Sequence, residues 1–298
     1  EWIIIDEVHE LLASERGSQL SLSLERLQLN SNQKIIRTGL SATIGNTDDA
    51  AQFLVGTKKP CKIIKDESVR KYEVEVKFVG GSISEVADSI IEYVEKLNLN
   101  SPILLFTNTR GESEFLASIL RDKTMMNIEL HHGSLSKQVR EETEGILRSG
   151  NRGIVVCTSS LELGLDIGSV ELVIHYGSPR QVSKLVQRIG RSRHSRNSSA
   201  RGLIITNNPD DEFEAKAILD RIKNSSIEEQ KIHDNSLDVL AHHLVGLSFQ
   251  IGEVSIDFAY KTIRQAYPFR NLTLDEFCDV LEIFDSIYIL YFDKEKMK

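Results

Sequence analysis

The chain has 298 residues, a length that suggests two domains. Hydrophobic residues make up 40% of it and charged residues 27%, which is ordinary for globular cores and excludes disorder as the default. The formal net charge of -8 argues against a surface covered with nucleic acid, although it leaves room for a local basic groove.

No apolar run approaches the roughly 20 residues of a membrane span and no secretory leader opens the chain, so no membrane partner is expected. The cysteines Cys61, Cys157 and Cys278 form no C-x-x-C pair, which predicts reduced, buried thiols in a cytoplasmic protein.

Two runs of alternating strand and helix patterns are predicted, joined by a looser connection at 58–81. The first run covers residues 1–57, and because it opens inside a strand we expect the chain to be truncated there. Its predicted elements are, in order, a strand, a helix, a strand and a helix: Trp2–Ile5, the helical spacing of Leu20, Leu24 and Leu27, Ile35–Leu40, and Ala50–Leu54. The connection carries one predicted strand, Tyr72–Val79.

The second run covers residues 82–227 and begins with helical spacing over 83–97. Short apolar strands follow, separated by helical patterns: Ile103–Phe106, Ile128–Leu130, Ile154–Cys157, Leu172–Ile174 and Leu203–Ile205. Continuous apolar strands with helical crossovers predict a parallel sheet covered on both faces. Ligands bind such sheets outside the carboxyl ends of the strands, so functional side chains are expected directly after each strand.

The pattern changes again after about residue 228, where a small and mostly helical domain is predicted over 228–298. Its helices are expected at Leu237–Leu247, Ile263–Ala266 and Leu274–Phe284, with a strand-like end at Ile287–Phe292. We expect more protein to follow Lys298.

Two adjacent carboxylates, Asp6 and Glu7, stand directly after the first predicted strand. In phosphoryl transfer one carboxylate holds Mg²⁺ and another orients or deprotonates the attacking water. Asp6 suits the metal and Glu7 suits the water. A polar strand end is the alternative interpretation.

Small hydroxyl residues, Ser41 and Thr43, follow the next strand. They can hydrogen-bond across to His9 and so report the nucleotide state to the rest of the domain. The alternative is an ordinary helix N-cap, which Ser and Thr favour.

Polar residues also follow three strands of the second run, where hydroxyl groups, amides and a Gly-Ser loop suit contact with phosphate and sugar. A capped helix start explains the first of these segments equally well. The paired histidines of the second suggest a metal, but no Cys, Asp or Glu lies at ligand spacing. The predicted nucleic-acid contacts are Thr107, Asn108, Arg110, His132, Gly133, Ser134, Thr158 and Ser159.

The run from Thr158 to Gly168 contains two residues suited to a nucleotide. Asp166 can accept a hydrogen bond from a ribose hydroxyl of ATP, and Gly164 allows the backbone to approach closely.

A basic helix follows. Its apolar positions, Val182, Leu185, Val186 and Ile189, form a buried face, whereas Gln187, Arg188 and Arg191 are predicted to point toward a cleft. The arginine fork matches phosphate oxygens and can stabilise a transferring γ-phosphoryl group. No Asp or Glu occurs from 172 to 209, so this stretch is expected near phosphates. A basic surface helix is the alternative.

In their order and spacing, five segments resemble motifs II to VI of superfamily II nucleic-acid helicases: D-E-V-H, S-A-T, F-T-N-T-R, T-S-S-L-E-L-G-L-D-I-G and Q-R-I-G-R. The S-E-R-G at 14–17 and the L-E-L-G at 161–164 are similar to the large helicase-related (Lhr-type) proteins, and 235–247 and 264–270 resemble the start of their winged-helix domain. The resemblance implies an α/β fold with a truncated RecA-like domain (1–57), a linker (58–81), a complete RecA-like parallel-sheet domain (82–227) and an incomplete winged-helix domain (228–298).

The resemblance also implies an ATP- and Mg²⁺-dependent helicase that translocates 3′-to-5′ from single-stranded tails, with DNA favoured over RNA or a hybrid as the partner. Asp6 and Glu7 would be the Mg²⁺ and water residues, and Arg188 and Arg191 the γ-phosphate residues. The remaining implied roles are coupling by His9, Ser41 and Thr43, and nucleotide contact by Gly164, Asp166 and Gln187.

Two departures from the family pattern matter. His194 stands where many superfamily II proteins have arginine, so Arg191 is the preferred arginine finger, with Arg188 and Arg193 as rivals. No G-x-x-x-x-G-K-[ST] occurs, so the loop that binds the ATP phosphates is expected upstream of Glu1, in the remainder of the first RecA-like domain. This chain alone is therefore expected to be inactive.

Two rival functions stay open. One is a nucleic-acid-binding or assembly module that never hydrolyses ATP; the other is a metal hydrolase using Asp6, Glu7 and His9, which would need further ligands.

A partial first sheet would also expose a strand edge and apolar surface. We therefore expect a symmetry mate or dimer partner to cover residues 1–57, or poor order there.

Overall fold

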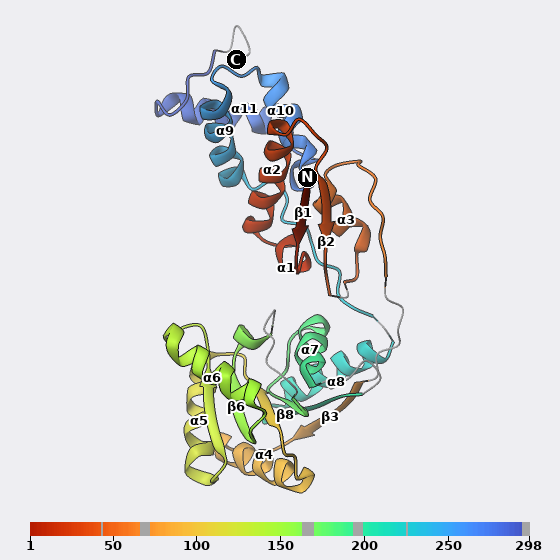
Figure 1. Cartoon of the computed structure of the whole chain (residues 1–298), viewed down its shortest axis with the longest axis vertical. Coiled ribbons are helices and arrows are strands. Elements are labelled where there is room, and N and C mark those ends of the chain that lie inside the picture. Colours follow the sequence, from red (N-terminus) through yellow and green to blue (C-terminus); the bar gives the residue numbers. More distant parts are fainter. Residues whose placement is uncertain (43, 66–71, 163–169, 193–198, 225, 294–298) are drawn as a thin grey trace. The chain divides into compact units, whose positions relative to one another are not determined.

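The structure is a computed structural model that describes residues 1–42, 44–65, 72–162, 170–192, 199–224 and 226–293 (Figure 1). The chain forms two compact units. The terminal unit joins both ends of the chain, Glu1–Asp66 and Glu229–Lys298, and the central unit is Glu67–Glu228. The predicted domain boundaries at 57, 81 and 227 stay predictions, and the units cut the chain elsewhere.

The central unit is built on a six-stranded parallel sheet of order β3-β8-β7-β4-β6-β5. Its strands are β3 (Tyr72–Phe78), β4 (Pro102–Phe106), β5 (Asn127–His131), β6 (Gly153–Cys157), β7 (Leu172–Tyr176) and β8 (Ala200–Thr206). The parallel sheet predicted from the apolar strands is confirmed. The strand predicted within the linker is β3, and it pairs with β8 along its whole length, so it belongs to this sheet.

Helices cover both faces of the sheet because successive strand residues point to opposite sides. In β4, Ile103 and Leu105 pack with α4 (Ile83–Leu97) and α5 (Arg110–Lys123). Leu104 and Phe106 face the other way, toward Leu147 of α6 (Lys137–Ser149). The helices α7 (Val182–Ile189) and α8 (Pro209–Lys223) pack against β8 in a third cluster.

The terminal unit combines a small sheet with helices from both ends of the chain. Its elements are β1 (Trp2–Ile5), α1 (His9–Leu12), α2 (Glu15–Asn30), β2 (Ile36–Gly39), α3 (Thr47–Val55), α9 (Leu237–Ile251), α10 (Ile256–Gln265), η3 (Tyr267–Phe269) and α11 (Leu274–Ser286). The strands β1 and β2 pair in parallel. Helix α2 packs two ways: Leu24 joins the core beneath β1, while Leu22 is buried among the helices beyond residue 229.

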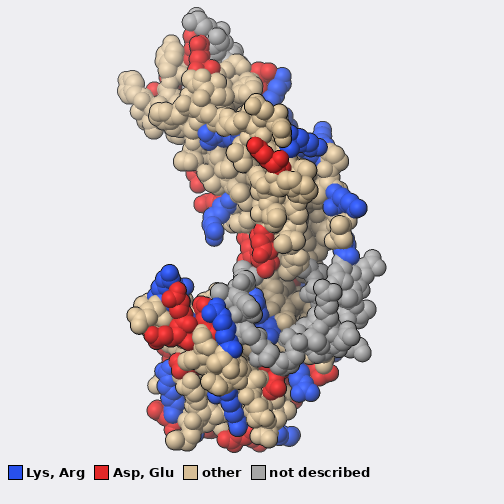
Figure 2. All heavy atoms as spheres, viewed as in Figure 1, with Lys and Arg blue, Asp and Glu red and all other residues tan. Residues whose placement is uncertain are grey.

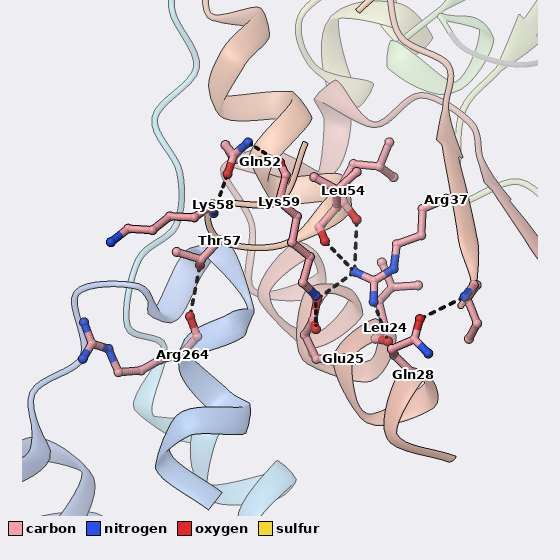
Figure 3. A network of polar contacts seen from close by, with 12 residues as sticks. Leu24, Glu25, Gln28, Arg37, Gln52, Leu54, Thr57, Lys58, Lys59 and Arg264 are labelled. Atoms are coloured by element: carbon pink, nitrogen blue, oxygen red, sulfur yellow. Dashed lines mark hydrogen bonds and ion pairs between the residues drawn. The ribbon is translucent and has the colours of Figure 1, made fainter. Parts of the chain in front are cut away.

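Polar contacts reinforce this junction. Thr57 donates from its backbone N–H to Gln265 O at 2.7 Å and from its hydroxyl to Arg264 O at 3.0 Å. Lys59 lies beside it and donates to the buried carboxylate of Glu25 at 2.6 Å (Figure 3). The helices after residue 229 therefore form one body with the first 65 residues.

The predicted strand at Ile287–Phe292 is wrong. Helix α11 ends at Ser286, and Tyr288 then adopts a positive φ of 60°. The Phe292 N–H turns back to donate to Asp285 Oδ1 at 3.1 Å. A strand needs a neighbouring ladder for its backbone groups, and this apolar run has none among the described residues.

The exposed apolar surface expected at the N-terminal strands is present. Trp2 is 71% exposed and Ile4 is 69% exposed on β1. Cover by a symmetry mate or dimer partner stays a prediction.

No disulfide joins the three cysteines; Cys157 is buried as expected, but Cys61 and Cys278 are half-buried, so that expectation is wrong for two of the three. Among the described helices, none is long and apolar enough to cross a membrane.

Candidate functional site

The sheet register brings the ends of its inner strands to one level. Cys157, the last residue of β6, pairs with Phe106 of β4 on one side and with His131 of β5 on the other. Phe106 also pairs with His175 of β7. The loops that follow these strands therefore share one edge of the sheet, as expected for a parallel α/β site.

The loop after β4 is held mainly by its own polar side chains. Thr107 is buried and its hydroxyl donates to Thr109 O at 2.9 Å. Asn108 donates to Ser178 O at 2.9 Å, which ties this loop to the one after β7. Thr109 and Glu112 form a capping box at the start of α5. Among the three predicted contacts here, Arg110 and Asn108 are exposed and Thr107 is not.

The loop after β5 offers a small exposed surface. His132 is buried; its Nδ1 accepts from the Ser134 N–H at 3.3 Å, and its Nε2 lies 3.1 Å from Glu114 Oε1. Gly133 and Ser134 are exposed. In the described part of the chain, no cluster of three or more metal-ligand residues occurs.

A contact at this edge was not anticipated from the sequence. His131 is buried and its Nδ1 lies 2.8 Å from Ser160 Oγ, while its Nε2 lies 3.5 Å from Glu144 Oε1. Burial lowers the pKa of His131. These contacts connect β5, α6 and the loop after β6, where Thr158 is half-buried and Ser159 is exposed.

Arg188 does not point into an open cleft. It is 4% exposed, and its Nη2 donates to Glu162 Oε2 at 3.1 Å. Its Nη1 donates to His175 Nε2, and its guanidinium lies 5.1 Å from the centre of the Phe106 ring. It is buried with the apolar residues of α7. This burial is possible because a buried carboxylate balances its charge and a neutral imidazole accepts one of its hydrogen bonds.

The tautomer of His175 follows from its neighbours. Burial, and then the nearby Arg188 charge, lower the pKa of His175 to about 3, so the ring is neutral. Its Nδ1–H donates to Gly177 O at 2.9 Å, which leaves Nε2 to accept from Arg188. Neither His175 nor Glu162 carried a recognisable signal on its own in the sequence.

Arg191 has a different environment, in η2 (Gly190–Ser192) at the end of α7. It is half-buried, and its Nη2 and Nε both donate to Glu162 O, at 2.7 and 3.2 Å. Gln187 is also half-buried. The predicted residues Gly164, Asp166, Arg193 and His194 lie outside the described residues.

The stretch from 172 to 209 contains no acidic residue, but in the structure acidic side chains from other segments lie next to several of its arginines. Arg180 pairs with Asp211 at 3.0 Å and with Glu214 at 2.8 Å, and Arg201 lies 3.6 Å from Glu73. Figure 2 shows basic and acidic side chains interspersed over the visible face of this unit. Acidic residues from outside the stretch therefore balance much of its charge.

In the terminal unit, the two carboxylates stand at the end of β1. The Glu7 N–H donates to Asp6 Oδ1 at 2.9 Å. Glu7 has a φ of 49°, a left-handed conformation that non-glycine residues seldom adopt. Such strain is concentrated at functional sites. Asp6 is exposed and Glu7 is half-buried.

His9 lies behind this turn and connects it to the segment after β2. It is 2% exposed, and its Nδ1 accepts from the Ala42 N–H at 3.3 Å and lies 3.2 Å from Ser41 Oγ. Its Nε2 lies 3.3 Å from Glu10 Oε1. The structure thus brings Ser41 to His9; Thr43 lies outside the described residues.

Comparison with known families gives two matches along the chain. The helicase conserved C-terminal domain matches residues 85–195, and the winged helix domain of large helicase-related proteins matches residues 220–287. The first covers most of the central unit, including the loops described above.

Two curated relatives match nearly the whole chain. An ATP-dependent helicase Lhr-Core of Methanocaldococcus jannaschii is 40% identical over 289 residues, which is 94% of this chain and 34% of the relative. Lhr-Core protein 2 of Thermococcus barophilus is 37% identical over 302 residues, covering 97% of this chain and 35% of the relative. The chain thus spans about a third of the length of these relatives.

A solved structure also matches. The Mycobacterium smegmatis helicase Lhr, bound to single-stranded DNA and AMP-PNP, superposes with a TM-score of 0.84 at 32% identity, over 95% of this chain and 38% of that one. Both family matches, the relatives and the solved structure agree with the motif order and with the RecA-like parallel sheet. The chain belongs to the Lhr-type superfamily II helicases.

Proposed function

We propose that this chain forms part of an ATP-driven motor that moves 3′-to-5′ along single-stranded DNA and unwinds the duplex ahead of it. The observation that carries the proposal is the gathering of the loops after β4, β5 and β6 at one edge of the central sheet. The names of the relatives support ATP-driven helicase activity, and the M. smegmatis complex supports a single-stranded DNA partner.

Asp6 would hold Mg²⁺ and Glu7 would orient the attacking water. Mg²⁺ keeps several waters and takes only one or two carboxylates beside the substrate phosphates, so an exposed carboxylate at a strand end fits it. Mg²⁺ would neutralise charge on the phosphate oxygens. The constrained backbone of Glu7 would fix the direction of its carboxylate.

Arg191 would contact the γ-phosphate, with Gly164, Asp166 and Gln187 holding the rest of the nucleotide. Arg191 is preferred to Arg188 because the Arg188 charge is already paired with a buried carboxylate. Arg191 now donates to a neutral carbonyl oxygen, and phosphate oxygens would be the stronger acceptors because they carry the opposite charge and can accept from the guanidinium in pairs.

Single-stranded DNA would run across the carboxyl edge of the central sheet. The exposed candidates are Asn108, Arg110, Gly133, Ser134 and Ser159, with Thr158 half-buried among them. Thr107 and His132 are buried and would shape these loops from beneath. Contacts of this kind reach phosphate and sugar and read no sequence.

The test is ATP hydrolysis with and without single-stranded DNA, by this chain and by a protein extended upstream to include a phosphate-binding loop. We expect the extended protein to hydrolyse ATP with stimulation by DNA, and this chain to be inactive. Glu7→Gln in the extended protein should lower kcat by roughly 10²–10⁴-fold, the usual size of a general-base contribution. Turnover by this chain alone, abolished by Glu7→Gln, would contradict the proposal. DNA binding without hydrolysis by either protein would favour a binding or assembly module.

A further inference from the structure

A buried carboxylate in the central unit has no role in the function proposed above. Glu162 follows η1 (Ser159–Leu161), and its side chain is 6% exposed. An ionised carboxylate in the interior is costly unless it is paired and hydrogen-bonded. Its partners therefore indicate what it does.

The first partner is Arg188, which is 4% exposed and lies 3.1 Å from Glu162 Oε2. His175 Nε2 accepts from Nη1 of Arg188, and the Phe106 ring lies beneath the guanidinium. Arg188 is thus held from three sides, each contributed by a different segment of the sheet or its loops. The ion pair fixes Glu162 to α7.

The second partner is Arg191, which contacts the same residue through a different atom. Its Nη2 and Nε donate to the Glu162 carbonyl oxygen at 2.7 and 3.2 Å. One residue therefore holds both arginines of the Q-R-I-G-R segment, Arg188 by its carboxylate and Arg191 by its main chain.

The two contacts belong to one residue, so the ion pair that anchors the Glu162 side chain also restrains the main chain that carries its carbonyl. We propose that Glu162 is a positioning residue that places the Arg191 guanidinium for the γ-phosphate, acting through its ion pair with Arg188. The inference rests on the proposed role of Arg191 in ATP hydrolysis. Glu162 itself touches no nucleotide in this scheme.

The experiment uses the protein extended upstream to include a phosphate-binding loop, with single-stranded DNA present. Glu162→Gln keeps the size of the side chain and removes its charge. We expect kcat for ATP to fall by about ten- to a hundredfold, a part of the roughly 10³–10⁵-fold that an arginine finger supplies, while KM changes by less than about threefold. Glu171→Gln is the matched control, a half-exposed carboxylate in the same β6–β7 connection, and it should retain wild-type kcat.

A double-mutant cycle separates positioning from general damage. If Glu162 acts through Arg191, then Glu162→Gln combined with Arg191→Ala is no slower than Arg191→Ala alone. If the two defects multiply, or if folded Glu162→Gln has wild-type kcat, the proposal is wrong.

A second variant covers the case in which Glu162→Gln does not fold. Glu162→Gln with Arg188→Met leaves no unpaired charge in the interior. It should fold by circular dichroism and still show the reduced kcat; a wild-type kcat would overturn the proposal. If the wild-type extended protein showed no DNA-stimulated ATP hydrolysis, that result would instead refute the proposed function.

Discussion

Arg37 Nη1 lies 2.7 Å from Glu25 Oε1, and the two side chains are 5% and 2% exposed (Figure 3). Removing one partner of such a pair leaves the other charged in the interior, so Glu25→Gln should lower the free energy of unfolding by roughly 3 kcal/mol. The control is Asp257→Asn, which breaks an ion pair of the same 2.7 Å length whose side chains are 74% and 70% exposed. That change should cost less than about 1 kcal/mol.

Trp2 provides the probe for this measurement. It is the single tryptophan of the chain and lies on β1, so its fluorescence during urea unfolding follows the terminal unit. Equal destabilisation by the two variants would show that the buried pair contributes no more than a surface pair.

Gly17 is required by a close backbone contact. A Cβ at this position would lie 1.9 Å from Leu11 O and 3.2 Å from the Phe53 ring. Gly17→Ala should therefore destabilise the terminal unit by about 2–3 kcal/mol, because the backbone of α1 must move. In Gly145→Ala, on α6, the added methyl meets nothing within 4 Å. That variant should gain roughly 0.5–1 kcal/mol from helix propensity. Thermal unfolding that moved both variants in the same direction would contradict this assignment.

Stability should fall in mild acid because of His175. Its pKa is lowered to about 3 by burial, and then by Arg188, whereas the unfolded chain titrates near 6.5. Above about pH 6.5 the His175 ring is neutral in both the folded and the unfolded chain. Below that pH it gains a proton only in the unfolded chain. The free energy of unfolding therefore falls by up to about 1.4 kcal/mol per pH unit between about pH 6 and 4.

His175→Gln tests this, because the amide can still accept from Arg188 and donate to Gly177 O. Circular dichroism in urea at pH 7 and pH 5 should show a pH slope smaller by one proton than in the wild type. His243 is the counterpart in the terminal unit, with its pKa lowered to about 4 by burial. His243→Gln should reduce the slope seen by Trp2 fluorescence instead. An unchanged slope in both variants would rule out these histidines.

The bond between Ser41 and His9 should couple hydrolysis to movement. In the extended protein, Ser41→Ala removes the hydroxyl 3.2 Å from His9 Nδ1. A hydrogen bond of about 1 kcal/mol corresponds to a roughly fivefold change, so we expect unwinding per ATP hydrolysed to fall about fivefold. Ser23→Ala, which removes an exposed hydroxyl bonded to Gln19 O, should leave that ratio unchanged. A proportional fall in hydrolysis and unwinding would contradict a coupling role.

The sheet of the central unit could be predicted because its strands are local apolar runs. The predicted Ile154–Cys157 and Leu172–Ile174 each match observed strands to within two residues at either end. Ile287–Phe292 has the same apolar character but lies beside no strand edge, and no local pattern reveals a missing partner. Leu22 and Leu24 show the same limit: the predicted helical spacing used Leu20, Leu24 and Leu27 and left out Leu22, which is buried in a different core from Leu24.

The predicted placement of Arg188 was wrong for a related reason. Helical periodicity counts every arginine as polar, so it assigned Arg188 to an open face. Its burial depends on Glu162, 26 residues earlier, and on His175, 13 residues earlier. Contacts of that range exist only once β6 and β7 lie in one sheet. The positions of Asp6 and Glu7 could be predicted from the strand before them alone, and in the structure they directly follow the end of β1.

Arg110 should be a phosphate contact for single-stranded DNA. It is exposed at the first position of α5, on the carboxyl edge of the central sheet. Arg110→Ala should weaken binding of an oligothymidine in fluorescence anisotropy and lower the slope of log affinity against log salt by about 0.7, the value for one phosphate of a single strand. Lys96→Ala is the control, because Lys96 is exposed in the last turn of α4, just ahead of the strand β4 that Arg110 follows. If both variants lower the slope equally, binding depends on net charge alone. If only Arg110→Ala lowers it, the single-stranded DNA runs along the loop after β4.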